Sequence, residues 1–135
     1  MERMTVEIPD HLEDILVAPV YGHLATVRPN DEVQLNPMWF EYDADERVIR
    51  FTHTTKRAKY RNLQQNPTMT LSALHPDSPF SYVEVRGRLV EVVPDPEGAF
   101  YVKLGQRYGD PDTQTPPDKA DRVVLVMSVD KVTGK

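Results

Sequence analysis

The sequence predicts a mainly β protein, in which short antiparallel strands form a closed or partly closed barrel with two or three short helices. Three observations lead to this prediction. Several segments alternate apolar and polar residues, and turn-forming residues separate them at short intervals. One segment with helical spacing interrupts the strands midway. The 135 residues are enough for one core but not for two, so we expect a single domain over residues 1–135.

The expected strands are Tyr21–Val27, Val33–Tyr42, Val48–Thr52, Thr68–Leu74, Tyr82–Val93 and Val123–Val132. Turn residues at Arg28–Asp31 and Asp43–Glu46 join the first three strands into a meander, and His75–Pro79 is expected to be a loop. We expect Pro37 to interrupt the second strand, because proline cannot donate to a sheet ladder. Gly87 is expected at a bulge or bend of the long fifth strand.

The expected helices are Ile8–Val17, Thr54–Asn66 and Ala99–Tyr108. The first is amphipathic and ends before Pro19, and the second ends before Pro67. Thr54 and Thr55 are candidate N-cap residues of the second helix. The segment Gly109–Asp118 is rich in proline, glycine and aspartate and is expected to be a surface loop.

The composition excludes several classes of protein. The longest apolar run, Val123–Met127, is too short to cross a membrane, and Met1–Ile8 has no apolar segment of the kind a secretory signal needs. The chain has no cysteine, which excludes disulfides, thiolate catalysis and cysteine–zinc sites and makes the cytoplasm the expected compartment. No metal site is expected, because the spacing of its four histidines does not suit metal ligands.

The charge of the chain is unevenly distributed. The net charge is −5, which argues against nucleic acid as a partner. Residues 47–76, however, include no Asp or Glu and carry six basic residues. These are Arg47, Arg50, Lys56, Arg57, Lys59 and Arg61. A basic segment in an acidic protein indicates a local anion site.

Part of this basic segment lies at the expected start of the second helix. Lys56, Arg57 and Lys59 fall in or beside its first turn, where cations oppose the helix dipole. A phosphate bound at the free N–H groups would reverse that effect. The alternative is a solvated basic helix face that only balances the acidic surface. The sequence has no Gly-x-x-x-x-Gly-Lys motif, which argues against a nucleotide triphosphatase.

A second group of unusual residues lies in the segment Val33–Tyr42. It contains Trp39, the only tryptophan, next to Pro37 and two side-chain amides. A proline within a strand leaves neighbouring backbone groups free, and these could hydrogen-bond the edge of a planar ring. The alternative is an ordinary edge strand with Trp39 packed in the core. No Ser/His/Asp arrangement or Gly-x-Ser-x-Gly motif is present, so we assign no catalytic residue.

Taken in order, these motifs give the chain a resemblance to a known family. The matching stretches are His23–Val27, Val33–Phe40, Ile49–Thr52, Lys56–Leu63 with Asn66–Pro67, Val83–Arg88 and Arg122–Val132. The chain resembles the pyridoxamine-phosphate-oxidase-like split-barrel family, and more closely its branch of oxidoreductases that depend on the deazaflavin coenzyme F420. The resemblance implies a six-stranded split β-barrel of the FMN-binding type, and a homodimer with two cofactor sites at the subunit interface.

The resemblance also assigns residues to the cofactor. It implies that Arg57 and Lys59, with Lys56 nearby, hold the cofactor phosphate. The residues implied to line the tricyclic ring and to pass beneath the ribityl chain are Asn36, Pro37 and Met38, and Thr52 and Thr54, respectively. Tyr82 and Arg107 are the candidates for completing the pocket from the other subunit.

The implied chemistry is transfer of a hydride from reduced F420 to a small, electron-poor organic acceptor. Two alternatives stay open. The chain could be an FMN-dependent oxidoreductase of the same family, or a non-catalytic protein that only binds a flavin or deazaflavin. Both need the same phosphate and ring contacts.

Overall fold

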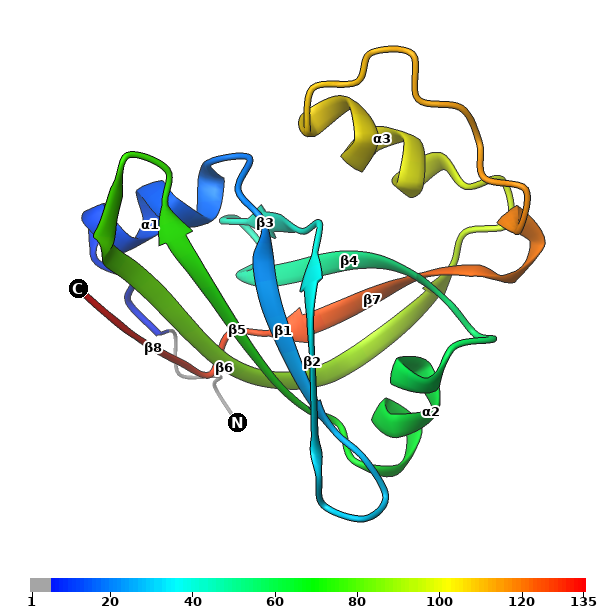
Figure 1. Cartoon of the computed structure of the whole chain (residues 1–135), viewed down its shortest axis with the longest axis horizontal. Helices are drawn as coiled ribbons and strands as arrows, with labels where there is room; N and C mark the ends of the chain where they lie inside the picture. The colour runs from blue at the N-terminus through cyan, green and yellow to red at the C-terminus, as the bar shows by residue number, and fades with distance from the viewer. Residues whose placement is uncertain (1–5) are drawn as a thin grey trace.

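One strongly curved antiparallel sheet forms the body of the protein in this computed structural model, which describes residues 6–135 (Figure 1). Its strands are β1 (Gly22–Val27), β2 (Val33–Met38), β3 (Glu41–Asp43), β4 (Val48–Thr54), β5 (Thr68–His75), β6 (Ser78–Pro94), β7 (Arg122–Ser128) and β8 (Lys131–Gly134). The helices are α1 (Asp10–Val17), α2 (Ala58–Gln65) and α3 (Ala99–Arg107), with a 3₁₀ turn at Lys119–Asp121. Residues 1–5, on which the expected absence of a signal segment partly rests, lie outside the described residues.

The strand order makes the sheet a split barrel. The order is β2-β1-β5-β6-β7-β4-β3, and β8 pairs with β6. The two end strands, β2 and β3, are joined only by Trp39 and Phe40, so the sheet must curl back towards itself. Strand β2 pairs with β1 alone, and β4 pairs with β3 only over Val48–Arg50. One edge of β2 and the edge of β4 beyond Arg50 therefore remain unpaired, which is the split.

This architecture confirms the predicted mainly β split barrel. Six strands have six residues or more, and β3 and β8 are shorter. The largest fully buried side chains include Phe40 and Phe51, and α1 contributes Ile15 and Leu16 to the same core. None of the helices within residues 6–135 is long and apolar enough to span a membrane.

Strand β7 is buried along its whole length because both of its faces are covered. Leu125 faces the main core, whereas Val124 and Val126 pack with Val48 on the opposite face, here called the outer face of the sheet. Phe100 of α3 packs against this outer cluster. Helix α3 therefore covers the outside of β4 and β7, as Figure 1 shows.

The expected interruption at Pro37 is wrong. Strand β2 continues to Met38, with Pro37 opposite His23 of β1. A proline is tolerated there because β2 is an edge strand of the sheet. The break comes after Met38 instead, where the backbone N–H of Phe40 donates to the hydroxyl of Tyr108 at 3.0 Å.

The second helix begins later than expected. Thr54 still belongs to β4 and pairs with Arg122, and the N–H of Thr55 donates to the carbonyl of Asp121 at 3.2 Å. Helix α2 therefore starts at Ala58 with Arg57 as its N-cap residue, and the predicted capping by Thr54 or Thr55 is wrong.

Three other boundaries also differ from the prediction. The expected loop His75–Pro79 shrinks to a tight turn, because β6 already begins at Ser78. The bulge of β6 lies between Leu89 and Glu91, and Gly87 is needed for a different reason: a Cβ there would lie 1.8 Å from the carbonyl oxygen of Ser128. The expected strand Val123–Val132 is two strands, β7 and β8.

Candidate functional site

Two adjoining cavities open along the split between β2 and β4. The first, of about 400 Å³, is called the α2 cavity, and its lining residues are Gln34, Asn36, Pro37, Met38, His53, Arg57, Ala58 and Lys59. The second, of about 380 Å³, is called the α3 cavity, and its lining residues are Tyr21, Pro37, Met38, Trp39, Thr52, His53, Arg57, Tyr101 and Arg122. Because four lining residues are common to both, the cavities form one groove with two ends.

A buried cation lies at the α2 end of the groove. Lys59 is only 3% exposed, and its Nζ donates to the Oδ1 of Asn36 at 2.9 Å. A second amide contact, from Asn62 Nδ2 to Gln34 Oε1 at 2.8 Å, also fixes α2 against β2. Burial lowers the pKa of Lys59 to about 8. A buried ammonium paired only with a neutral amide is costly, and a bound anion would offset that cost.

Arg57 stands next to this cation at the start of α2. Its side chain is exposed and lines both cavities. Within residues 6–135, no carboxylate lies within ion-pair distance of Arg57 or Lys59. The first backbone N–H groups of α2 also lack a side-chain cap. The α2 end thus combines two cations with free helix N–H groups, which is an arrangement that suits a phosphate.

His53 lies on the wall that the two cavities share. It is 4% exposed, and its Nε2 has no hydrogen-bond partner among the described residues. Burial lowers its pKa to about 4, and the positive charges of Lys59, Arg57 and Arg122 act in the same direction. The imidazole is therefore neutral at neutral pH, and the middle of the groove lies in a positive field.

Aromatic side chains form the wall of the α3 end. Tyr108 stacks on Tyr21, with ring centroids 5.6 Å apart, and on Trp39, with centroids 5.3 Å apart. Tyr101 of α3 lies 6.1 Å from the Trp39 ring. The hydroxyl of Tyr108 donates to the carbonyl of Val20 at 2.8 Å, and burial raises its pKa. These contacts fix the wall, which offers flat apolar surface to a planar ligand.

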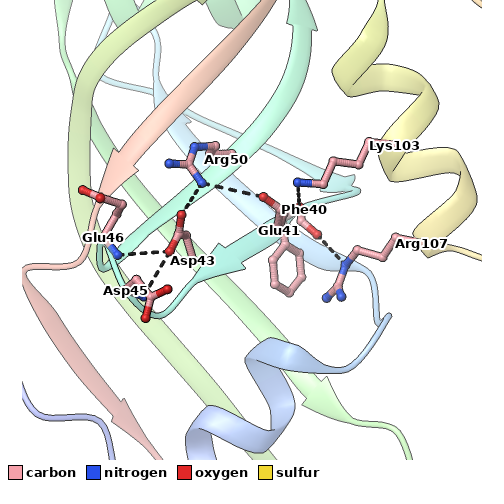
Figure 2. Close-up of polar contacts among 8 residues, drawn as sticks. All are labelled: Phe40, Glu41, Asp43, Asp45, Glu46, Arg50, Lys103 and Arg107. Atoms are coloured by element: carbon pink, nitrogen blue, oxygen red, sulfur yellow. Dashed lines mark hydrogen bonds and ion pairs between the residues drawn. The ribbon is translucent and has the colours of Figure 1, made fainter.

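Polar contacts hold α3 against the start of β3 (Figure 2). Lys103 forms an ion pair with Glu41 at 2.8 Å, next to the ion pair between Arg50 and Asp43. Arg107 donates to the carbonyl of Phe40 at 3.0 Å and also to the carbonyl groups of Val17 and Ala18 at the end of α1. The position of Tyr101 is thus set by contacts at the C-terminal half of its helix.

The structure brings together six of the ten residues that the resemblance assigned to the cofactor. Those lining the groove are Asn36, Pro37, Met38, Thr52, Arg57 and Lys59. The others line neither cavity. Thr54 is buried and its Oγ1 accepts from the N–H of Lys56 at 3.3 Å, while the side chain of Lys56 is exposed. Tyr82 lies on β6 and is 41% exposed, and Arg107 is engaged with backbone carbonyls.

Other residues of the groove were not assigned to the cofactor from the sequence. Trp39 lines the α3 cavity and is only partly buried, so the alternative of a core tryptophan is wrong. Arg122 carries no local signal, because it enters the site only through the pairing of β4 with β7. His53 lies between Thr52 and Thr54, which were assigned to the cofactor, but a single histidine gives no signal of its own. Tyr21 and Tyr101 come from segments that border β1 and β6.

Comparison with known proteins defines the class of protein. The family model described as pyridoxamine 5′-phosphate oxidase matches residues 8–135, and the chain belongs to this family. A solved structure named F420 reductase is 52% identical, with 93% of this chain and 98% of that chain covered and a TM-score of 0.89. This similarity agrees with the F420 branch of the family. Together the two findings support an oxidoreductase.

More distant structures share the fold. A conserved hypothetical protein from Mycobacterium tuberculosis is 21% identical, with coverage of 99% and 88% and a TM-score of 0.74. The General Stress Protein 26 from Bacillus anthracis is 20% identical, with coverage of 93% and 91% and a TM-score of 0.67. The comparison with curated protein sequences returned no match.

Proposed function

We propose that this protein is an oxidoreductase that binds coenzyme F420 in the groove and reduces a small, electron-poor organic acceptor. The observation that carries the proposal is the buried Lys59, which lines a groove beside the start of α2 with only a neutral partner. A phosphate-bearing cofactor would supply the missing counter-charge. The 52% identity with a structure named F420 reductase favours the deazaflavin over FMN.

The α2 end would hold the phosphate. Lys59 and Arg57 provide the two cations, and the first N–H groups of α2 provide further donors. Asn36 fixes the Lys59 ammonium in position at 2.9 Å. The threonine hydroxyls assigned by resemblance differ in access: Thr52 lines the groove and Thr54 does not.

The middle of the groove would hold the tricyclic ring. Here the unpaired edges of β2 and β4 flank the split, and alternate residues of an edge strand direct backbone N–H and C=O groups outward. Pro37 and Met38 on one side and His53 on the other leave a slot between the two edges. A reduced deazaflavin supplies a hydride, and the protein supplies its orientation and the surrounding charges.

The α3 end of the groove would hold the acceptor. Trp39 and Tyr101 wall it with aromatic surface, and α3 shields it from one side. This division, with an anion site at one end and an apolar wall at the other, supports an enzyme rather than a protein that only stores cofactor. An FMN-dependent enzyme of the same family is the second candidate, since the same phosphate contacts would serve FMN.

The test is a titration of the purified protein with F420 and FMN side by side, followed by turnover assays. We expect micromolar or tighter binding of F420, weaker binding of FMN, and repeated oxidation of reduced F420 when an acceptor is present. Tight, stoichiometric binding of FMN without any binding of F420 would contradict the cofactor assignment. Binding without turnover across a panel of acceptors would favour a non-catalytic binder.

A further inference from the structure

Arg122 brings a buried positive charge to the aromatic end of the groove. It is the first residue of β7 and pairs with Thr54 of β4. Directly paired residues share one face of a sheet, so Arg122 lies on the outer face, under α3. Its side chain is only 8% exposed and lines the α3 cavity with Tyr101 and Thr52.

Two contacts orient the guanidinium. Its Nε donates to Oδ1 of Asp118 at 3.0 Å, and its Cζ lies 4.9 Å from the centre of the Tyr101 ring. Neither Nη1 nor Nη2 has a hydrogen-bond partner among residues 6–135, and neither is among the buried unpartnered atoms. Both terminal nitrogens are therefore accessible, and the cavity that Arg122 lines is the space that they reach.

We propose that Arg122 binds the oxygen of the acceptor, so that the α3 cavity takes planar conjugated molecules bearing a carbonyl or carboxylate group. The proposal rests on the proposed function of the groove. Trp39 and Tyr101 would contact the flat part of such a molecule, and the two free Nη groups would donate to its oxygen. Guanidinium is suited to this because it presents donors in a fixed planar fork.

The chemistry of the reaction gives this contact a role beyond binding. When a hydride adds to the β-carbon of a conjugated carbonyl compound, the C=C electron pair shifts towards the carbonyl group. The compound becomes an enolate, whose negative charge lies largely on the oxygen. A proton from water then adds to the α-carbon, which completes a two-electron reduction at the expense of the reduced cofactor. Arg122 would stabilise the charge on that oxygen in the transition state.

A purely structural role for Arg122 would not require the observed arrangement. One ion pair with Asp118 and one stacking contact with Tyr101 use the Nε edge and one face of the guanidinium. These contacts leave both Nη groups without a protein partner, and the α3 cavity that Arg122 lines is large enough to hold a ligand that accepts from them.

The first test uses the protein without cofactor and reads the fluorescence of Trp39, which is the only tryptophan. The probes are benzoate and its neutral counterpart benzamide. We expect benzoate to bind better than benzamide, and Arg122→Met to weaken benzoate binding tenfold or more with little change for benzamide. Arg122→Lys should keep part of the preference. Equal binding of the two probes by the parent protein would overturn the proposal.

Matched variants separate a structural effect from this role. Arg88→Met removes another arginine that is paired with an aspartate but lines neither cavity, and it should leave both probes unaffected. Asp118→Asn should reduce the preference for benzoate because it loosens the guanidinium. Melting temperatures of all variants report whether they fold. If Arg122→Met and Arg122→Lys fold and bind both probes like the parent, the proposal is wrong.

The second test measures turnover of reduced F420 with cyclohexenone. Arg122→Met should lower kcat/KM at least tenfold and leave F420 affinity within twofold. A loss of F420 affinity instead would assign Arg122 to the cofactor and overturn this inference while the proposed function stands. A preference for benzoate that depends on Arg122, in a protein that neither binds nor oxidises F420, would refute the proposed function alone.

Discussion

Two side chains at the start of α2 carry the strongest prediction at the scale of single residues. Arg57→Ala and Lys59→Ala should each weaken F420 binding by roughly tenfold to a hundredfold, because a charge-assisted hydrogen bond contributes about 1.5–3 kcal/mol. The apo melting temperature of Lys59→Ala should stay the same or rise, since burying this ammonium is costly. Titration of cofactor fluorescence measures the affinities.

Arg61→Ala is the matched control. Arg61 lies on the same helix, is exposed and lines neither cavity, so its loss should change affinity little. If all three variants bind alike, the basic segment is only a solvated helix face.

The pH dependence of cofactor binding should also report Lys59. Burial lowers its pKa to about 8 in the free protein, and a bound phosphate would raise it again. The complex then holds a proton that the free protein loses above pH 8, so affinity should be constant just below that pH and fall as pH rises, by at most about tenfold per unit. Lys59→Arg should shift this fall to higher pH. An unchanged profile in that variant would assign the titration to another group.

His53 should make the protein less stable in acid. Its pKa is about 4 in the native state and 6.5 in an ordinary environment, so the unfolded state binds more protons between these values. The free energy of unfolding should therefore fall by about 1.4 kcal/mol per pH unit from this residue as pH drops from 6.5 towards 4. Below pH 4 the loss should be complete.

Urea unfolding at several pH values measures this effect. In His53→Phe, the free energy of unfolding should change less steeply with pH over that interval, by the amount that one proton contributes. The slope that remains is due to carboxylates. An identical slope in parent and variant would show that His53 titrates normally.

Some residues of the groove could be recognised from the sequence and others could not. Arg57 and Lys59 are neighbours in the sequence, so their clustering could be recognised before any fold was known. Arg122 could not be recognised in this way, because the segment from α2 to α3 separates it from Arg57 and Lys59, and only the ladder between β4 and β7 brings it to the groove. A residue that reaches the site through the pairing of distant strands leaves no local pattern in the sequence.

At the scale of elements, α3 depends on a buried carboxylate that caps it from outside. Asp95 accepts hydrogen bonds from the N–H groups of Ala99 and Phe100, both at 3.0 Å, and is 8% exposed. Asp95→Ala leaves two part-buried N–H groups without their partner and should lower the free energy of unfolding by about 1–2 kcal/mol in urea titrations.

Asp112→Ala is a suitable control, since Asp112 is exposed in the loop after α3. That change should stay within about 0.5 kcal/mol of the parent protein. Comparable losses in both variants would mean that Asp95 does not cap α3.

The elements themselves were largely predictable, and the errors have physical causes. Alternation and turn residues located the strands, but they carry no information about where a ladder ends. Thr54 stays in β4 because Arg122 pairs with it, although its hydroxyl suits a helix cap equally well. Pro37 was expected to break β2, and only the position of that strand at the edge explains why it does not.

At the scale of the whole molecule, the apolar residues left exposed on β2 indicate where a second copy would bind. Val33 and Leu35 are 64% and 59% exposed, and alternation places them on the face of β2 opposite to Asn36. We propose that a homodimer covers this face, with Tyr82 contributed across the interface. Strand β7 is unavailable for such contacts, since it is buried within the protomer.

Light scattering on the protein as it elutes from a size-exclusion column measures its mass and so tests for the homodimer. The parent should have about twice the protomer mass of 15.5 kDa, and Leu35→Asp should approach the protomer mass with weaker F420 binding. Val17→Asp is a comparable change at the end of α1, where Val17 is 51% exposed, and it should keep the parent mass. A monomeric parent that binds F420 normally would contradict an interface site.

The pairing of β4 with β7 also determines how the chain reaches its native state. These strands are separated in sequence by α2, β5, β6 and α3, yet β7 buries seven consecutive residues between β4 and β6. The entropy of closing so long a loop must be lost before the contacts that repay it can form. Folding should therefore be slow for a chain of this size, and the α3 end of the groove is incomplete in any intermediate that lacks β7, because Arg122 arrives with that strand.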